Sequence, residues 1–536
     1  MIRDTSEKQL SLSEFDWPFQ TQLDAENRWV KLAGVIPWDE LGETYYKKLD
    51  TTQGRPSKPA RLVIGAVIIK HKLVLSDRET IDQLSENPYL QYFAGLPGFQ
   101  CEKPFDASLL VTIRHRMGQD VFDEFHQTIV NQMESLSAGK PAEQSKTDDP
   151  PEDDGSGSSM GSEQIACVDE ASEETASHQG RLILDATVAE QAIRYPTDLS
   201  LLNEAREFTE QIIDHLYGAC SLDKKPRTYR VKARREYLSV AKKRKNSKRK
   251  IRKAIKGQLQ YVGRNLRHIE QLLSYFEVGV QLPLPNGLLR RYWVIPHVYT
   301  QQLEMYQSKA KRCDDRIVSI SQPWVRPIVR GKQHKSTEFG AKINVSLDAH
   351  KLARVDRFSW DAYHEGNDLE KQVEAYQQRY GHYPEVLIGD GIYGTRANRA
   401  YLKSKQIRFG GKPVGRPRKQ TPENEQEIKA ERKQRQSEYR QRIPIEGKFG
   451  QGKGGYRLNY IRAKRSATSQ SWVNSIFLVM NLLVLYELFY WLRKRVIRSR
   501  MGCRWVMIAW SALISAMGVD KRGVSAGVLP EFGCQY

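Results

Sequence analysis

One segment of this chain cannot form a core, and it limits how the rest can fold. Residues 138–180 are acidic, rich in Ser, Gly and Pro, and poor in apolar side chains. Such a composition buries too little surface to offset the entropy lost on ordering, so we expect a disordered linker. The chain of 536 residues is also too long for a single core. It should therefore fold as separate units on either side of the linker.

The unit before the linker, residues 1–137, is predicted to be all helical. Apolar residues recur at helical spacing through 58–134, and Ser76 has the setting of a helix N-cap. The first residues contain no apolar core of a secretory signal. The pattern fits two roles, DNA-end binding or dimerisation, and does not separate them.

The unit after the linker, residues 181–495, is predicted to be α/β. Short apolar runs at 181–189 and 384–394 indicate buried strands, and 338–365 indicates a hairpin. Helical patterns alternate with these strands, which favours a mixed sheet. A helical insertion is expected at about 200–320.

The insertion carries the most basic part of a chain whose net charge is +20. An excess of this size suggests a polyanionic partner, most simply nucleic acid, although a solvated basic surface would give the same composition. Between residues 224 and 256 cations crowd together, and Glu236 is the one acid. The expected phosphate-binding residues of this arm are Lys242, Lys243, Arg244, Lys245, Lys248, Arg249 and Lys250.

Two predicted strands each carry an acid, Asp185 and Asp390. If the strands are parallel neighbours, both carboxylates meet at one edge of the sheet. Glu446 follows later, in a segment that mixes cations, a proline and glycines. Three gathered carboxylates repel one another, and a divalent cation removes the conflict. All-oxygen ligation favours Mg²⁺ or Mn²⁺. A capping or turn role is the alternative for each single Asp.

These residues resemble the DDE transposases of bacterial insertion sequences. Residues 184–187 and 389–402 resemble the family's first-acid and second-acid motifs, and 76–96 resembles its InsH-type N-terminal module. The signature Y-x2-R-x3-E-x6-K is matched at every spacing by Tyr439, Arg442, Glu446 and Lys453. The resemblance implies a ribonuclease H-like catalytic domain with two Mg²⁺ ions, which Mn²⁺ can replace. It also implies that Asp185, Asp390 and Glu446 are the catalytic and metal-binding acids.

The signature segment is predicted to contain a helix break. Pro444 disfavours a helix interior but suits a first turn, so we expect a helix to begin near it with Glu446 in that turn. Arg442, Lys453 and Lys448 are expected to bind phosphates, and Tyr439 to hydrogen-bond a phosphate or stack on a base. The alternative is that Tyr439 and Arg442 pack locally and pair with acids such as Glu438.

The resemblance implies a transposase that binds terminal inverted repeats, cleaves the element ends and joins the 3′-hydroxyl to target DNA. A homodimer on paired ends and a bacterial cytoplasmic, nucleoid-associated location are also implied. Two other functions stay open: a nuclease of the same fold without strand transfer, and a catalytically silent DNA-binding regulator.

Four further features bound this prediction. The apolar run 475–492 is interpreted as a buried core helix rather than a membrane span, so no membrane partner is expected. The six cysteines form no C-x-x-C pair, which fits a reducing cytosol. Metal ligation by His334, His350, His364 or His382 has no support from spacing. Residues 496–536 form a tail to which the sequence assigns no role.

Overall fold

The computed structural model describes residues 11–16, 22–49, 56–138, 178–220, 222–277, 279, 281–329, 337–411, 421 and 424–516. The predicted disordered linker therefore lies outside the described residues except at its two ends. His334 and the last twenty residues of the predicted tail, 517–536, also lie outside them.

The N-terminal unit is helical, as predicted. After the short turn η1 (Leu12–Glu14) its helices are α1 (Arg28–Ala33), α2 (Trp38–Tyr46), α3 (Ala60–Lys72), α4 (Asp77–Glu86), α5 (Pro88–Phe93), α6 (Leu109–Arg116) and α7 (Gln119–Ala138). Ser76 caps α4: its hydroxyl accepts a hydrogen bond from the Glu79 amide at 3.2 Å. The Glu79 carboxylate in turn accepts one from the Ser76 amide at 2.6 Å. This reciprocal pairing satisfies amides that a helix start would leave open.

Six strands of the described residues form one mixed sheet. They are β1 (Arg181–Glu190), β2 (Arg326–Val329), β3 (Thr337–Leu347), β4 (Ala353–Ser359), β5 (Val386–Gly389) and β6 (Arg408–Phe409). The order is β2-β3-β1-β5-β6, with β4 also paired to β3. β3 is antiparallel to β1, β2 and β4, whereas β5 is parallel to β1 and β6. The predicted hairpin is β3–β4; β2 was not predicted.

Helices cover both faces of this sheet. Leu182 and Leu184 of β1 face a core shared with α12 (Leu369–Tyr380) and α13 (Arg396–Ser404). Ile183 faces a core shared with α15 (Ile443–Gly455) and α16 (Ser466–Ala516). Because side chains alternate along a strand, Asp185 points to the face of α15 and α16.

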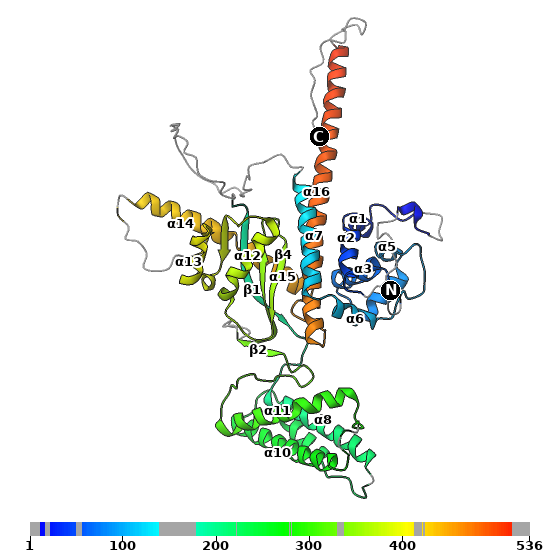
Figure 1. Ribbon diagram of the computed structural model, residues 1–536, viewed down its shortest axis with the longest axis vertical. Coiled ribbons are helices and arrows are strands. Elements are labelled where there is room, and N and C mark those ends of the chain that lie inside the picture. The colour runs from blue at the N-terminus through cyan, green and yellow to red at the C-terminus, as the bar shows by residue number, and fades with distance from the viewer. Residues whose placement is uncertain are drawn as a thin grey trace.

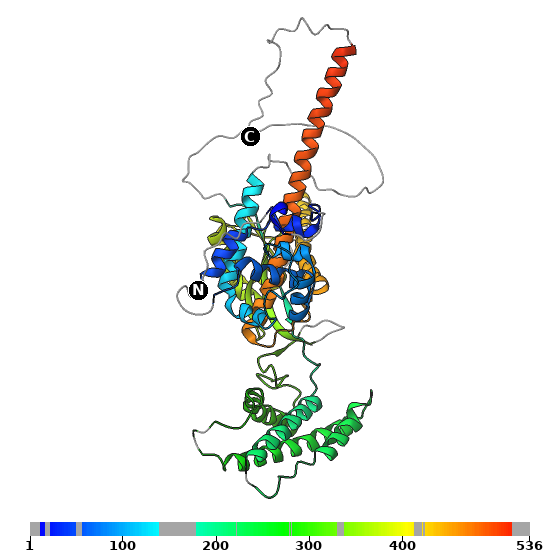
Figure 2. The ribbon, with the colours of Figure 1, turned by 90° about the vertical axis from the view of Figure 1, so that its right-hand side faces the viewer.

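The insertion between β1 and β2 is a separate helical body below the sheet in Figures 1 and 2. Its helices are α8 (Asp198–Ala219), α9 (Arg230–Ala241), α10 (Lys248–Leu273) and α11 (Asn286–Ser308). They share their own apolar core, with Ile213, Val262 and Ile295 fully buried. These helices lie within the range of the predicted insertion, and their buried residues form a cluster of their own.

Helix α16 joins the N-terminal helices to the α/β unit. It runs beside α7 (Figure 1) and also contacts α3, α6, α15 and β4. Among the described residues this helix, over Ser466–Arg495, is the one long and apolar enough to cross a membrane, and half of its most apolar window is buried in protein. That burial supports the core-helix interpretation. The helix continues past 495 to Ala516 and projects from the body (Figures 1 and 2).

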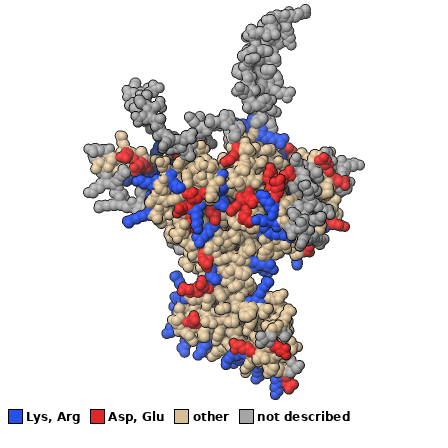
Figure 3. Space-filling model, viewed as in Figure 1, with Lys and Arg blue, Asp and Glu red and all other residues tan. Residues whose placement is uncertain are grey.

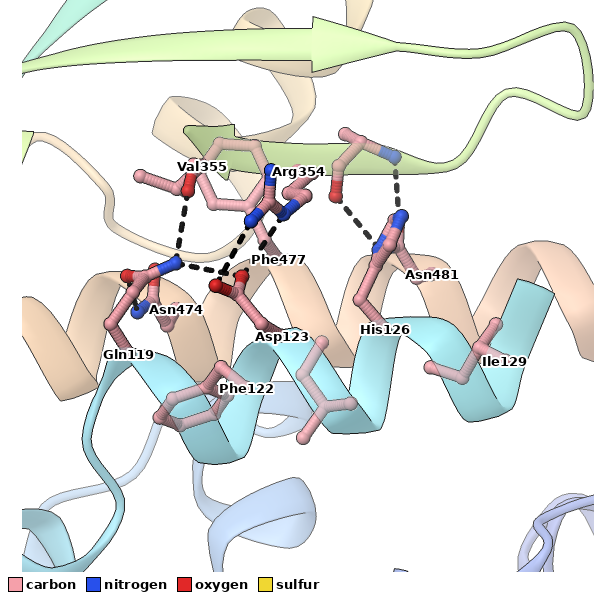
Figure 4. A pocket seen from close by; sticks show the side chains of 12 residues that line it. Gln119, Phe122, Asp123, His126, Ile129, Arg354, Val355, Asn474, Phe477 and Asn481 are labelled. Carbon is pink, nitrogen blue, oxygen red and sulfur yellow. Dashed lines mark hydrogen bonds and ion pairs between the residues drawn. The ribbon is translucent and has the colours of Figure 1, made fainter. Parts of the chain in front are cut away.

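Polar side chains line the contact between α7, β4 and α16, around a small cavity drawn in Figure 4. Asn481 pairs with both backbone groups of Ala353, accepting at 2.9 Å and donating at 2.8 Å. Asp123 forms ion pairs with Arg354 at 2.9–3.0 Å. These contacts fix the edge of the sheet against the N-terminal unit.

Candidate active site

The parallel pairing of β1 and β5 places Asp185 and Asp390 on neighbouring strands, at the point where β5 ends. Leu184 pairs with Gly389, so each acid immediately follows a paired residue. β5 ends there, whereas β1 continues to Glu190 beside β3. Asp185 therefore lies within its strand, not at its end as the sequence suggested.

Local hydrogen bonds orient these two acids differently. Asp185 accepts one from the Ala186 amide at 2.8 Å and is 16% exposed. Asp390 caps the short turn η3 (Gly391–Tyr393), accepting from the Gly391 amide at 2.6 Å, and is 63% exposed. The capping role that the sequence left open for Asp390 is thus present together with its position beside Asp185.

Glu446 reaches this edge because the signature segment is broken as predicted. Helix α14 (Glu425–Arg440) ends just before Arg442, and α15 begins at Ile443 with Pro444 in its first turn. Pro444 needs no amide hydrogen there, so the position suits it. Glu446 lies in the same first turn, where the helix dipole favours a negative charge.

Arg442 contacts all three acids. Its Nη1 lies 3.8 Å from Asp185 Oδ2 and 4.0 Å from Asp390 Oδ2, and its Nη2 donates to Glu446. Because two distances end on one nitrogen, those oxygens lie within about 8 Å of each other, which a pair of ions about 3.5–4 Å apart could span. The side chain of Arg442 is only 13% exposed. The structure therefore brings the three predicted acids around one guanidinium.

Charge and burial act on these groups in opposite directions. Burial raises the pKa of Asp185, and the negative charges of Glu365 and Glu446 add to this, against the Ala186 amide and Arg442. Burial would lower the pKa of Arg442, but the three carboxylates outweigh it and raise that pKa. Arg442 is thus held firmly in its charged form.

The three acids are chemically suitable ligands for a divalent cation. Carboxylate oxygens are the donors that Mg²⁺ and Mn²⁺ prefer. Within the described ranges, however, no three His, Cys, Asp or Glu side chains are arranged closely enough to hold a metal ion. Each of the three carboxylates lies within ion-pair distance of Arg442. The three carboxylates are chemically suited to a divalent cation, and the guanidinium of Arg442 is in contact with all of them.

The other signature residues lie on two helices, Tyr439 near the end of α14 and Lys453 on α15. Tyr439 is 57% exposed, and its ring lies 5.4 Å from the guanidinium of Arg442. Glu438 pairs with Arg408, whereas Arg442 pairs with Glu446 four residues along the chain, so the local pairing of Arg442 with an acid is present, with a different acid from Glu438. Lys453 is half-buried in the last turn of α15.

Lys448 does not share the face of Glu446. Two residues along a helix correspond to a rotation of about 200°, so the two side chains point apart. Burial lowers the pKa of Lys448, while the nearby charges of Glu487 and Asp348 oppose that change. Lys448 therefore lies on a different face of α15 from Glu446, and its role in DNA binding stays a prediction.

The sequence analysis missed a fourth acid near the site. Glu365, in the turn η2 (Glu365–Asp368), acts electrostatically on Asp185 and forms an ion pair with Lys342 at 2.7 Å. Lys342 lies on β3 opposite Val188, three residues after Asp185. Only the fold brings this pair to the acids, and no motif or spacing signals it.

The predicted cationic arm lies on the helical body, away from the sheet. Its seven residues, which span the end of α9, the following loop and the start of α10, are all exposed. Figure 3 shows Lys and Arg side chains along the outer edges of this body. The arm is therefore accessible but belongs to a different unit from the three acids.

Comparison with known proteins gives two family matches. A model described as Transposase domain (DUF772) matches residues 18–116, and one described as Transposase DDE domain matches residues 387–483. A Rhizobium meliloti protein, "Uncharacterized protein ORF8 in nfe locus", is 36% identical over 130 residues. That stretch covers 23% of this chain and 61% of the relative. No solved structure matches the chain.

Proposed function

We propose that this chain, a DDE transposase of the insertion-sequence type by its two domain matches, moves its own element by cleavage and strand transfer. It would bind the terminal inverted repeats, cut the element ends and join them to target DNA. The observation that carries the proposal is the convergence of Asp185, Asp390 and Glu446 on Arg442.

The sheet supports a ribonuclease H-like catalytic domain. Three antiparallel strands (β4, β3 and β1) are followed by two strands parallel to β1, and helices cover both faces. Asp185 lies on the central strand and Asp390 after its parallel neighbour. Sites in open α/β sheets are commonly found at such a strand edge.

The reaction we propose has two displacements at phosphorus. Water attacks the phosphodiester at the element end, its oxygen bonds to phosphorus, and the 3′ oxygen leaves to become a hydroxyl. That hydroxyl then attacks a target phosphorus and displaces another 3′ oxygen. Two Mg²⁺ ions held by Asp185, Asp390 and Glu446 would supply activation of the attacking oxygen and stabilisation of the leaving one.

The remaining side chains would position DNA. The fork of Arg442 can grip a phosphate, and exposed Tyr439 beside it can stack on a base or hydrogen-bond a phosphate. The cationic arm would hold the duplex through phosphates without reading its sequence. The N-terminal unit would bind the element ends or pair two copies of the chain as a homodimer.

A joining assay tests the proposal. A duplex that ends at the element's exposed 3′-hydroxyl is labelled and incubated with supercoiled target plasmid, Mg²⁺ and the full chain. Labelled plasmid is the expected product. Cleavage of an uncut terminal duplex without any joined product would favour a nuclease of the same fold. Tight binding with neither reaction would favour the silent regulator.

A further inference from the structure

We propose that Arg442 occupies the place of the metal ions in the DNA-free enzyme and couples metal binding to DNA binding. In this state the arginine offsets part of the negative charge of the three acids, and it leaves them when a DNA phosphate binds it. The inference rests on the proposed function, since it concerns how the same acids come to hold their ions.

The contacts of Arg442 use both of its terminal nitrogens. Nη1 lies between Asp185 and Asp390 at 3.8 and 4.0 Å, and Nη2 donates to Glu446. Its Nε is buried and makes no hydrogen bond. Both terminal nitrogens therefore face carboxylates, Nη2 through a hydrogen bond and Nη1 through longer charge contacts, and a second anion on the fork would have to displace them.

The acids carry more negative charge than Arg442 can neutralise. Three carboxylates surround one guanidinium, which leaves an excess of two negative charges if all are ionised. Mg²⁺ ligands lie at about 2.0–2.1 Å, whereas the Asp185 and Asp390 oxygens stand nearly 4 Å from Nη1. The position between these two acids is the one from which an ion would reach both, so the guanidinium and an ion compete for it.

A phosphate offers Arg442 an equivalent partner. A guanidinium binds carboxylate and phosphate in the same bidentate geometry, so it can exchange one for the other. Tyr439, exposed and 5.4 Å from the guanidinium, marks the solvent side from which DNA would approach. Once the fork grips DNA, the acids lose their counter-ion and bind divalent metal more tightly. By linkage, metal raises DNA affinity by the same factor.

The test measures metal affinity instead of activity. Mn²⁺ is titrated into the full chain by isothermal calorimetry, with and without a terminal duplex that is already cut and so offers no bond to hydrolyse. We expect the duplex to raise the wild-type affinity for Mn²⁺ by about 5–150-fold. Arg442→Gln should bind Mn²⁺ more tightly than wild type without DNA, and DNA should add little. Arg440→Gln, two residues earlier in the chain and exposed at the end of α14, is the matched control and should behave as wild type.

A second variant separates the effect of the two-nitrogen geometry of the guanidinium from the effect of its charge. Arg442→Lys keeps the positive charge but has one terminal nitrogen in place of two, so it cannot bridge the acids in the same way. It should therefore also bind Mn²⁺ more tightly than wild type when DNA is absent. Circular dichroism in chelator checks that each variant folds. Equal Mn²⁺ affinity of wild type and both variants would overturn the inference. If Glu446→Gln binds Mn²⁺ as tightly as wild type both with and without DNA, the proposed metal site itself fails.

Discussion

The cationic arm gives a prediction whose size follows from the structure. Seven exposed cations lie within nine residues of chain, from Lys242 to Lys250. Each phosphate neutralised by such a residue steepens the dependence of log K on log salt by about 0.9 for duplex DNA. If all seven contact phosphates, they contribute a slope of about −6. Affinity would then fall about a thousandfold or more between 50 and 200 mM salt.

Neutralising four of these residues tests that estimate. Changing Lys242, Lys243, Arg244 and Lys245 to Gln should make the slope shallower by about 3–4 and weaken binding alike for terminal and unrelated duplexes. Fluorescence anisotropy with labelled duplex across a salt series measures the slope. Because contacts from other units are the same in both proteins, they cancel in the difference.

A control of equal charge keeps the test specific. Arg267, Arg290, Lys311 and Arg312 are exposed on the same helical body but outside the arm. Changing these four to Gln removes the same net charge and should leave the slope within about 1 of wild type. If the arm variant keeps the wild-type slope, the arm does not contact DNA and its charge serves only solubility.

Two further changes test contacts inside the folded units, since Asp77 lies among the N-terminal helices and Asn481 joins α16 to β4. Two cations outweigh burial and lower the pKa of Asp77 to about 2 from its ordinary 3.8, so Asp77→Asn should cost about 2 kcal/mol at neutral pH. The wild type should lose this stabilisation as pH falls from about 4 towards 2, whereas the variant should not. Urea titrations at pH 7 and pH 3 measure the free energy of unfolding of both proteins. An equal loss of stability in the two proteins between these pH values would contradict the reasoning. The cost of Asp77→Asn includes leaving the buried ammonium of Lys70 without its ion-pair partner, 2.9 Å away. Burial lowers the pKa of Lys70 even with Asp77 present. Asn481→Ala would remove the side chain that pairs with both backbone groups of Ala353. It should lower the free energy of unfolding by about 2–4 kcal/mol, measured by the same urea titrations. A change below about 0.5 kcal/mol would show that these two hydrogen bonds contribute little.

Several parts of the fold could be predicted because the information is local. Alternating apolar runs and helical periodicity located β1, the β3–β4 hairpin and the helical insertion. An acid after each of two buried strands predicted the meeting of Asp185 and Asp390, and their parallel pairing is found. Proline chemistry alone placed the start of α15 within one residue, at Ile443.

Other parts depend on the three-dimensional path of the chain. β2 has four residues and a proline, so its strand character comes from pairing with β3. The signature placed Arg442 one helical turn from Glu446, but its contacts with Asp185 and Asp390 arise only when the sheet and α15 pack. Lys448 is cationic in the sequence, and the rotation of α15 turns it inward.

We propose that the three converging acids carry out DNA cleavage. The most direct measurement is the rate at which the full chain cuts a labelled duplex bearing the element's terminal repeat, in Mg²⁺ and in chelator. Glu446→Gln removes one proposed ligand, and several kcal/mol of lost stabilisation corresponds to a fall of about a hundredfold or more. Glu370→Gln, an exposed acid on α12, is the control and should keep the wild-type rate. Cleavage that needs Mg²⁺ and disappears only in Glu446→Gln is the predicted result, and equal Mg²⁺-dependent rates for all three proteins would contradict the account.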